Sequence, residues 1–173
     1  VFGLAFLTLF SATLVAKDRE SAFLQRLYTT PLTAADFILG YALPVLPMAL
    51  TQGALCYLVA LALGLPFTVS IFSALLLLLP VSLFFIAFGL LCGSVLSVKQ
   101  VGGLCGALFT NLTAWLSGVW FSLDLLGGAF RRIANALPFV HAVELERAAL
   151  AGNYAAMLPH LGWVLAYAAA AAL

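Results

Sequence analysis

The longest stretch without a charged residue sets the strongest limit on what this chain can fold into. The 62 residues of 37–98 contain no Asp, Glu, Lys or Arg. As one α-helix they would be about 93 Å long, whereas the hydrocarbon core of a bilayer is about 30 Å thick. The run therefore predicts two membrane crossings. Gly64 and Pro66 are typical of a helix end and a helix start, and they divide the run into spans of about 34–64 and 66–95.

The composition agrees with a membrane protein and excludes a soluble domain. Only 8% of the 173 residues are charged and 65% are hydrophobic, whereas soluble domains have about 25% charged residues. The formal net charge of +1 provides no basic surface for nucleic acid. The three cysteines stand singly in apolar runs, and we expect them to be small core residues rather than metal ligands or disulfides.

Three further apolar segments lie outside the charge-free run, at about 1–16, 101–121 and 161–173. Together they predict an all-α integral membrane protein, a polytopic transmembrane helix bundle with five spans in a single domain over 1–173. The first and last segments are shorter than the roughly 17–25 residues that a span needs. We therefore expect more chain on each side.

The densest charge cluster is Lys17-Asp18-Arg19-Glu20. Four charges inside lipid would cost on the order of 10 kcal/mol, so the cluster must lie in water or at the membrane surface. At 100° per residue, the apolar residues after it share one side of a helix, which predicts a short amphipathic helix. These residues are Phe23, Leu24, Leu27 and Tyr28. Composition alone also permits a solvated loop that only fixes topology.

The segment after this helix contains a stop and a new start. Pro31 ends the helix and pushes Thr30 out of helical geometry. Thr33 and Asp36 have the spacing of a capping box, which predicts that the next span begins directly after Thr33.

A second polar region, 121–159, precedes the last apolar segment. Four apolar residues at helical spacing predict an interfacial or re-entrant helix: Leu126, Phe130, Ile133 and Leu137. Pro138 separates it from a second helical piece in which Glu144 and Arg147 form an i,i+3 pair. This region is either a lid over the span ends or a gate for substrate release. The single residues His141 and His160 are expected at the interface rather than as ligands.

Small and polar residues in the spans predict helix contacts. The Gly89-x-x-x-Gly93 and Gly102-x-x-x-Gly106 pairs let helices approach closely, and we favour packing within one protomer over a dimer contact. Thr110, Asn111 and Thr113 either line a transport path or bond to a neighbouring helix, with the second favoured.

Two segments together resemble the type-2 ABC transporter permeases, the transmembrane subunits of ABC transporters. The first, 17–32, has an Arg-Glu pair, a Leu and a Thr-Pro in this order, followed by Leu39-Gly40. The second has Ser117-Gly118 at the end of a span, then a Leu-Pro at Leu137-Pro138, then Arg147. The resemblance implies six spans in a full chain, of which this sequence lacks the first. It also implies a second permease protomer, as a homo- or heterodimer, a multi-pass location in the bacterial inner membrane, and a separate ATPase subunit.

In that family the helix after the second span is a coupling helix that docks on the ATPase. Carried onto this chain, the role falls on Arg19, Glu20, Phe23, Leu24, Arg26, Leu27, Thr30 and Pro31. This assignment places 17–36 and Lys99 in the cytoplasm and 121–159 outside. No phosphate-binding G-x-x-x-x-G-K-[ST] motif is present. We therefore expect no cofactor and no catalysis in this chain, with ATP and Mg bound by the partner.

The resemblance also implies export of a hydrophobic or amphipathic substrate such as a drug, lipid or glycan. Its path is expected between protomers, with Phe2, Phe6 and Phe10 on one wall and Asn111 and Trp115 on the other. The main alternative is a channel or secondary transporter not coupled to ATP. That class usually has an ionisable residue within a span, and the predicted spans have none. An intramembrane enzyme would need catalytic groups at the same depth, where the sequence predicts no His, Asp or Glu.

Overall fold

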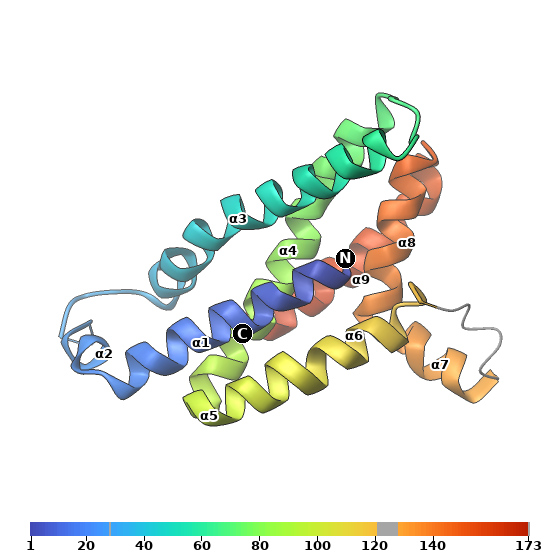
Figure 1. Ribbon diagram of the computed structural model, residues 1–173. Coiled ribbons are helices and arrows are strands. Elements are labelled where there is room, and N and C mark those ends of the chain that lie inside the picture. Colours follow the sequence, from blue (N-terminus) through green and yellow to red (C-terminus); the bar gives the residue numbers. More distant parts are fainter. Residues whose placement is uncertain (28, 121–127, 173) are drawn as a thin grey trace.

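Figure 1 shows a computed structural model of the chain, which describes residues 1–27, 29–120 and 128–172. The described residues form helices and no strand, which confirms the predicted all-α class. The elements are η1 (Phe2–Leu4), α1 (Ala5–Glu20), α2 (Ala22–Leu27), α3 (Ala34–Ala62), α4 (Ser70–Val95), α5 (Val98–Val101), the π-helix η2 (Gly102–Phe109), α6 (Thr110–Leu116), α7 (Gly128–Ala136), α8 (Pro138–Leu150) and α9 (Tyr154–Ala172).

Helix α4 is the centre of the bundle. It packs against α1, α3, α8 and α9, and its buried side chains, among them Phe84, Phe85 and Ile86, form much of the core. Helix α1 lies between α3 and the α5–η2–α6 stretch (Figure 1). Helix α2 is at one end of the molecule, whereas α7, α8 and the α3–α4 turn are toward the other end.

Three of the described helices are long and apolar enough to cross a membrane: α3, α4 and α9. Together with the all-helical bundle they make the chain a multi-pass membrane protein. The predicted segments 1–16 and 101–121 also coincide with helices, but α1 has 16 residues and the other stretch is divided among α5, η2 and α6. Five spans therefore stay a prediction.

The turn between the first two long helices differs from the prediction at one end. Helix α3 begins after Thr33, whose hydroxyl accepts a hydrogen bond from the Asp36 N–H while Asp36 reaches back, as the capping box predicts. It ends near Gly64, which has a φ of 105° that favours glycine. Pro66 does not start the next helix, because α4 begins only at Ser70.

Helix α9 begins seven residues earlier than the predicted Leu161. Its first turn is stabilised by the Asn153 side chain, which accepts a hydrogen bond from the Ala156 N–H at 3.3 Å. Pro159 is tolerated inside the helix near its N-terminal end. The predicted start followed the apolar run alone and missed this cap.

The polar region before α9 forms two helices, as expected. Phe130 and Leu137 pack on the core, while Ala134 is fully buried and Ile133 is exposed. An interfacial position for this stripe stays a prediction, and the predicted stripe residue Leu126 is outside the described residues. In α8 the Arg147 and Glu144 side chains form the predicted ion pair, at 2.8 Å.

Candidate functional site

Three charged residues at the end of α1 connect it to three other helices. Asp18 accepts a hydrogen bond from the Tyr41 hydroxyl of α3 at 2.6 Å. Arg19 donates to the backbone carbonyls of Ser94 and Leu96 at the end of α4. Glu20 accepts from the Val98 N–H, the first residue of α5, at 3.2 Å. These three residues therefore form a structural joint between α1 and its neighbouring helices, and Arg19 and Glu20 are themselves exposed.

Arg19 and Glu20 occupy the last turn of α1, not the amphipathic helix to which the sequence assigned them. Ser21 has an extended backbone, with φ −98° and ψ 164°, which separates α1 from α2. The Ser21 hydroxyl accepts a hydrogen bond from the Phe23 N–H at 3.2 Å, at the start of α2. Helix α2 is therefore a distinct six-residue helix that follows the joint.

Among the α2 side chains that the structure describes, the large apolar ring of Phe23 is exposed. Phe23 is 52% exposed, Arg26 is exposed and Leu27 is half-buried. The side chain of Leu24 and all of Tyr28 lie outside the described residues. An exposed phenylalanine beside an arginine is a surface that a partner protein can cover.

The chain turns sharply after α2, as the Thr30-Pro31 pair predicts. The Thr30 hydroxyl donates to the Leu27 carbonyl at 2.6 Å, which satisfies a carbonyl at the helix end. A hollow of about 400 Å³ lies between this turn and the start of α3 and is lined by Leu27, Thr30 and Phe37, among others. Thr30 and Pro31 are both exposed, as is Phe23.

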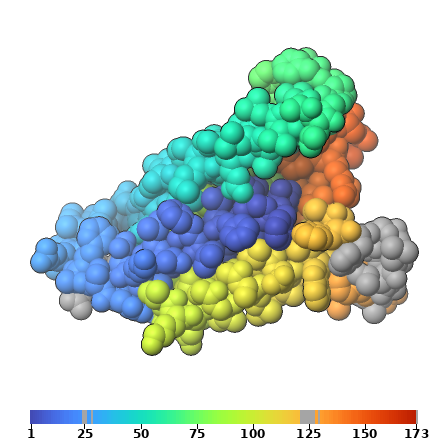
Figure 2. Space-filling model, in the orientation of Figure 1, coloured from blue at the N-terminus to red at the C-terminus, as the bar shows by residue number. Residues whose placement is uncertain are grey.

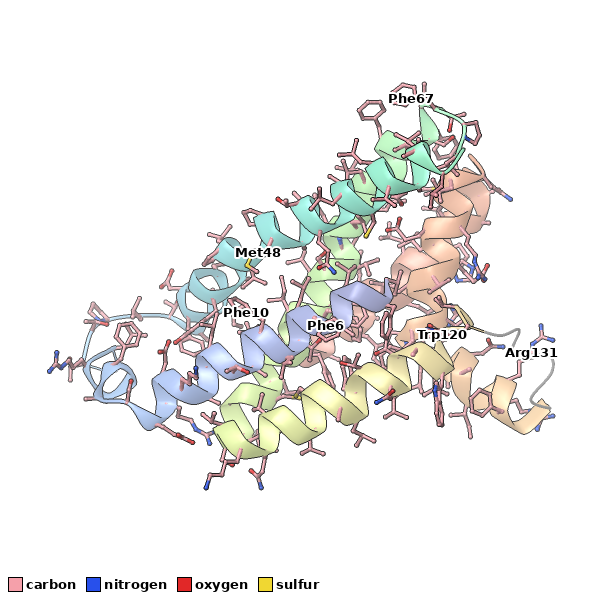
Figure 3. The ribbon with its side chains drawn as sticks, in the orientation of Figure 1. Phe6, Phe10, Met48, Phe67, Trp120 and Arg131 are labelled. Atoms are coloured by element: carbon pink, nitrogen blue, oxygen red, sulfur yellow. The ribbon has the colours of Figure 1, made fainter. Side chains whose placement is uncertain are left out.

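Three of the aromatic residues predicted for the transport path are exposed. Phe6 and Phe10 of α1 are 50% and 43% exposed and lie one helical turn apart (Figure 3). Phe2 forms edge-to-face ring contacts with Phe6 at 6.2 Å and with Trp120 at 6.1 Å. Trp115 of α6 is also exposed. The sequence analysis did not place Trp120 on the path, although it follows α6 and contacts Phe2 of η1.

The polar residues of the other wall behave differently from the favoured expectation. The Asn111 amide donates to the Ala107 carbonyl at 2.7 Å, and the Thr113 hydroxyl donates to Phe109 at 2.9 Å. Thr110 likewise donates to a carbonyl of its own helical stretch. The prediction that they bond to a neighbouring helix is therefore wrong. Asn111 and Trp115 are both exposed, and their position on a transport path stays a prediction.

The glycines of α4 hold α1 close. A Cβ on Gly89 would lie 2.6 Å from the Thr8 carbonyl oxygen, and one on Gly93 would lie 2.5 Å from that of Ala12. The predicted small-residue contact within one protomer is confirmed for this pair. Of the second pair, Gly106 faces Leu9, while Gly102 has nothing within 4 Å.

A buried carboxylate in α8 is the clearest feature that the sequence did not predict. Glu146 is 8% exposed, and its Oε2 accepts a hydrogen bond from the Tyr57 hydroxyl at 2.9 Å. Burial raises the pKa of Glu146 to about 7, although the bond from Tyr57 acts in the opposite direction. No sequence signal marked Glu146. The ion pair that the sequence predicts for Arg147 is with Glu144, two residues before Glu146.

The two histidines also come together rather than standing alone. Nδ1 of His141 and Nδ1 of His160 are 2.8 Å apart, and the His141 ring stacks on Trp163 with centroids 4.9 Å apart. The contact joins α8 to α9. Among the residues that the structure describes, no group of three or more His, Cys, Asp or Glu is placed to hold a metal ion.

The cysteines are free thiols in the described part of the chain. Cys105 is buried and Cys92 is partly buried, in agreement with the expected core role, but Cys56 is exposed. The core expectation is therefore wrong for Cys56.

Comparison with known families covers most of the chain. The family model described as ABC-2 type transporter matches residues 1–151. No curated protein and no solved structure matches the chain. The matched region includes the α1 joint, α2, both long helices α3 and α4, and α8. The chain belongs to the ABC-2 type transporter family and is a membrane permease component of an ABC transporter.

Proposed function

We propose that this permease exports a hydrophobic or amphipathic substrate, such as a drug, lipid or glycan, across a bacterial plasma membrane. It works as one of two protomers and is driven by a separate ABC ATPase, which binds the ATP and Mg²⁺. Helix α2 is the coupling helix that docks on this ATPase. In the resulting orientation α2 and Lys99 are cytoplasmic, and α7 and α8 are on the outer side.

The observation that carries this proposal is the joint beside α2. A docked α2 is continuous with α1 through Ser21, and its other end leads through the Thr30-Pro31 turn into the capped start of α3. Asp18, Arg19 and Glu20 connect the same point to α3, α4 and α5. A small displacement of α2 would therefore shift four helices together, which is how closure of an ATPase becomes tilting of a bundle.

The exposed aromatic side of α1 and α6 supports the dimer and the path. Figure 2 shows the surface of α1 between α3 and the α5–η2–α6 stretch on this side. Phe6 and Phe10 are exposed there, and Met48 of α3 continues the apolar surface at 48% exposure (Figure 3). We place the second protomer opposite this side, with the substrate between the two. Aromatic walls suit an apolar or amphipathic substrate.

The test compares two identical substitutions at opposite ends of the bundle. Phe23→Ala removes the exposed ring of α2, and Phe67→Ala removes a ring that is 73% exposed in the α3–α4 turn. Each intact variant is expressed with the ATPase encoded beside it, and the amount of ATPase that co-purifies and the transport rate are measured.

We expect Phe23→Ala to reach the membrane at the wild-type level but to lose at least tenfold of the bound ATPase, a loss typical of a docking residue. Phe67→Ala should behave as wild type. Wild-type association and transport in Phe23→Ala would contradict the coupling assignment. Normal coupling with no movement of any apolar or amphipathic compound would contradict the proposed substrate class.

A further inference from the structure

A cavity beside α8 contains Glu146, the buried carboxylate of that helix. Its volume is about 290 Å³, and it is enclosed by the start of the chain, the second half of α3, part of α4, and α8. The lining residues are Val1, Gly3, Leu4, Gln52, Gly53, Cys56, Tyr57, Ala60, Leu78 and Glu146. The cavity is open on one side, and Cys56 in its lining is exposed.

Glu146 is under-satisfied in this cavity. Its Oε2 accepts a hydrogen bond from the Tyr57 hydroxyl at 2.9 Å, but its Oε1 is buried and has no hydrogen-bond partner. Buried carboxylate oxygens are normally paired, because an unpaired one loses the hydration that it had in water. The free oxygen of a carboxylate that lines a cavity is therefore a place for a donor from outside the chain.

The other walls define what kind of donor fits. Leu4, Ala60 and Leu78 are apolar, while Gln52 and Tyr57 provide further polar atoms. A divalent metal ion needs several charged or oxygen ligands, and the described residues place only one carboxylate here. A single positive charge attached to an apolar body matches one carboxylate among apolar walls.

We propose that this cavity is a binding site for lipophilic amines, in which Glu146 pairs with the ammonium group and the apolar walls hold the attached hydrocarbon. The Oε1 atom accepts an ammonium N–H, and Tyr57 keeps the carboxylate oriented by donating to Oε2. The inference rests on the proposed function only in treating such an amine as a transport substrate. Binding itself requires neither the ATPase nor transport.

The electrostatics of the site make binding depend on pH. Burial holds the pKa of Glu146 at about 7, so the carboxyl is half-ionised near neutrality without a ligand. The titratable groups that face it are the Tyr57 hydroxyl and the Cys56 thiol from α3. An alkylamine stays protonated to about pH 10. Its affinity should therefore rise with the ionised fraction of Glu146, by about tenfold between pH 6 and pH 8.

The experiment uses a charged ligand and its neutral analogue. Binding of 4-phenylbutylamine and 4-phenylbutanol to the intact permease in lipid nanodiscs is measured by calorimetry, with empty nanodiscs as the correction for partition into lipid. Glu146→Gln keeps an acceptor for Tyr57 but removes the charge. Glu144→Gln is the matched control, because Glu144 lies two residues away, is 41% exposed and pairs with Arg147.

We expect Glu146→Gln to weaken binding of the amine at pH 8 by about tenfold or more, because one charge-assisted contact is lost. Binding of the alcohol should be unchanged, and Glu144→Gln should match wild type with both ligands. Equal amine affinity in wild type and Glu146→Gln would overturn the proposal.

A second measurement needs no variant, so it tests the proposed amine site even if Glu146→Gln fails to fold. In the wild-type protein the amine affinity should rise between pH 6 and pH 8 while that of the alcohol stays constant. A flat amine profile would overturn the proposal. Amine binding without any ATP-driven transport would support this site and count against the proposed export function, so the two failures are distinguishable.

Discussion

Adding one methyl group to Gly89 should separate α1 from α4. A Cβ there would lie 2.6 Å from the Thr8 carbonyl oxygen and would overlap the Ser11 hydroxyl. The nearest obstacle is backbone, so the two helices must move apart by roughly 1 Å to restore normal contact. Such overpacking costs about 1–3 kcal/mol. Alanine recovers about 1 kcal/mol of helix propensity, and separation also weakens the 2.8 Å bond from the Thr8 hydroxyl to the Phe85 carbonyl.

The matched control is Gly162→Ala in α9, where an added Cβ meets nothing within 4 Å. We expect Gly89→Ala to lower the free energy of unfolding by about 2 kcal/mol and Gly162→Ala to raise it by about 0.5–1 kcal/mol. The assay is unfolding of the permease in dodecylmaltoside micelles by titration with SDS, followed by circular dichroism. Equal stability of the two variants would refute the close packing of α1 on α4.

Three further predictions follow from single contacts. Arg19→Gln should reduce substrate-stimulated ATP hydrolysis several-fold, because Arg19 joins α1 to the end of α4, whereas Lys17→Gln should not; equal rates would argue against the joint. Thr8→Val removes the hydrogen bond to Phe85 and should cost about 1 kcal/mol in the same SDS titration; an unchanged midpoint would contradict this. Because the folded pKa of Glu146, about 7, exceeds its ordinary value of 4.5, the folded state binds more protons between these values. The free energy of unfolding of the wild type should therefore fall by about 3 kcal/mol as pH rises from 4.5 to 7. If Glu146→Gln showed the same dependence on pH, another group would be responsible for the fall.

Sequence patterns predicted two kinds of feature. One is a contact between residues that are close in the chain, and the other is a helix that must be apolar because it lies in lipid. The charge-free run indicated the two long helices, because charges are costly in hydrocarbon. The Thr33 and Asp36 pair predicted the start of α3, since both hydrogen bonds span three residues. The glycines of α4 predicted a close helix contact, although not which helix would fill it.

Contacts between distant residues could not be predicted in the same way. Glu146 and Tyr57 are 89 residues apart, and Glu20 and Val98 are 78 apart. No local pattern distinguishes a carboxylate that faces water from one that faces another helix. The family resemblance assigned Arg19 and Glu20 to the coupling helix, but the extended backbone of Ser21 separates them from α2. That division places the charged joint on α1 and leaves α2 free to meet a partner.

The central claim is that α2 faces the compartment that contains the ATPase. In a variant without the three native cysteines, Phe23→Cys and Phe67→Cys place one thiol at each end of the bundle, both at exposed positions. A membrane-impermeant maleimide is applied to intact cells and, separately, to permeabilised cells. We predict that Phe67→Cys is labelled in intact cells and that Phe23→Cys is labelled only after permeabilisation. Labelling of Phe23→Cys in intact cells would place α2 outside, where no ATPase can reach it, and would contradict the account.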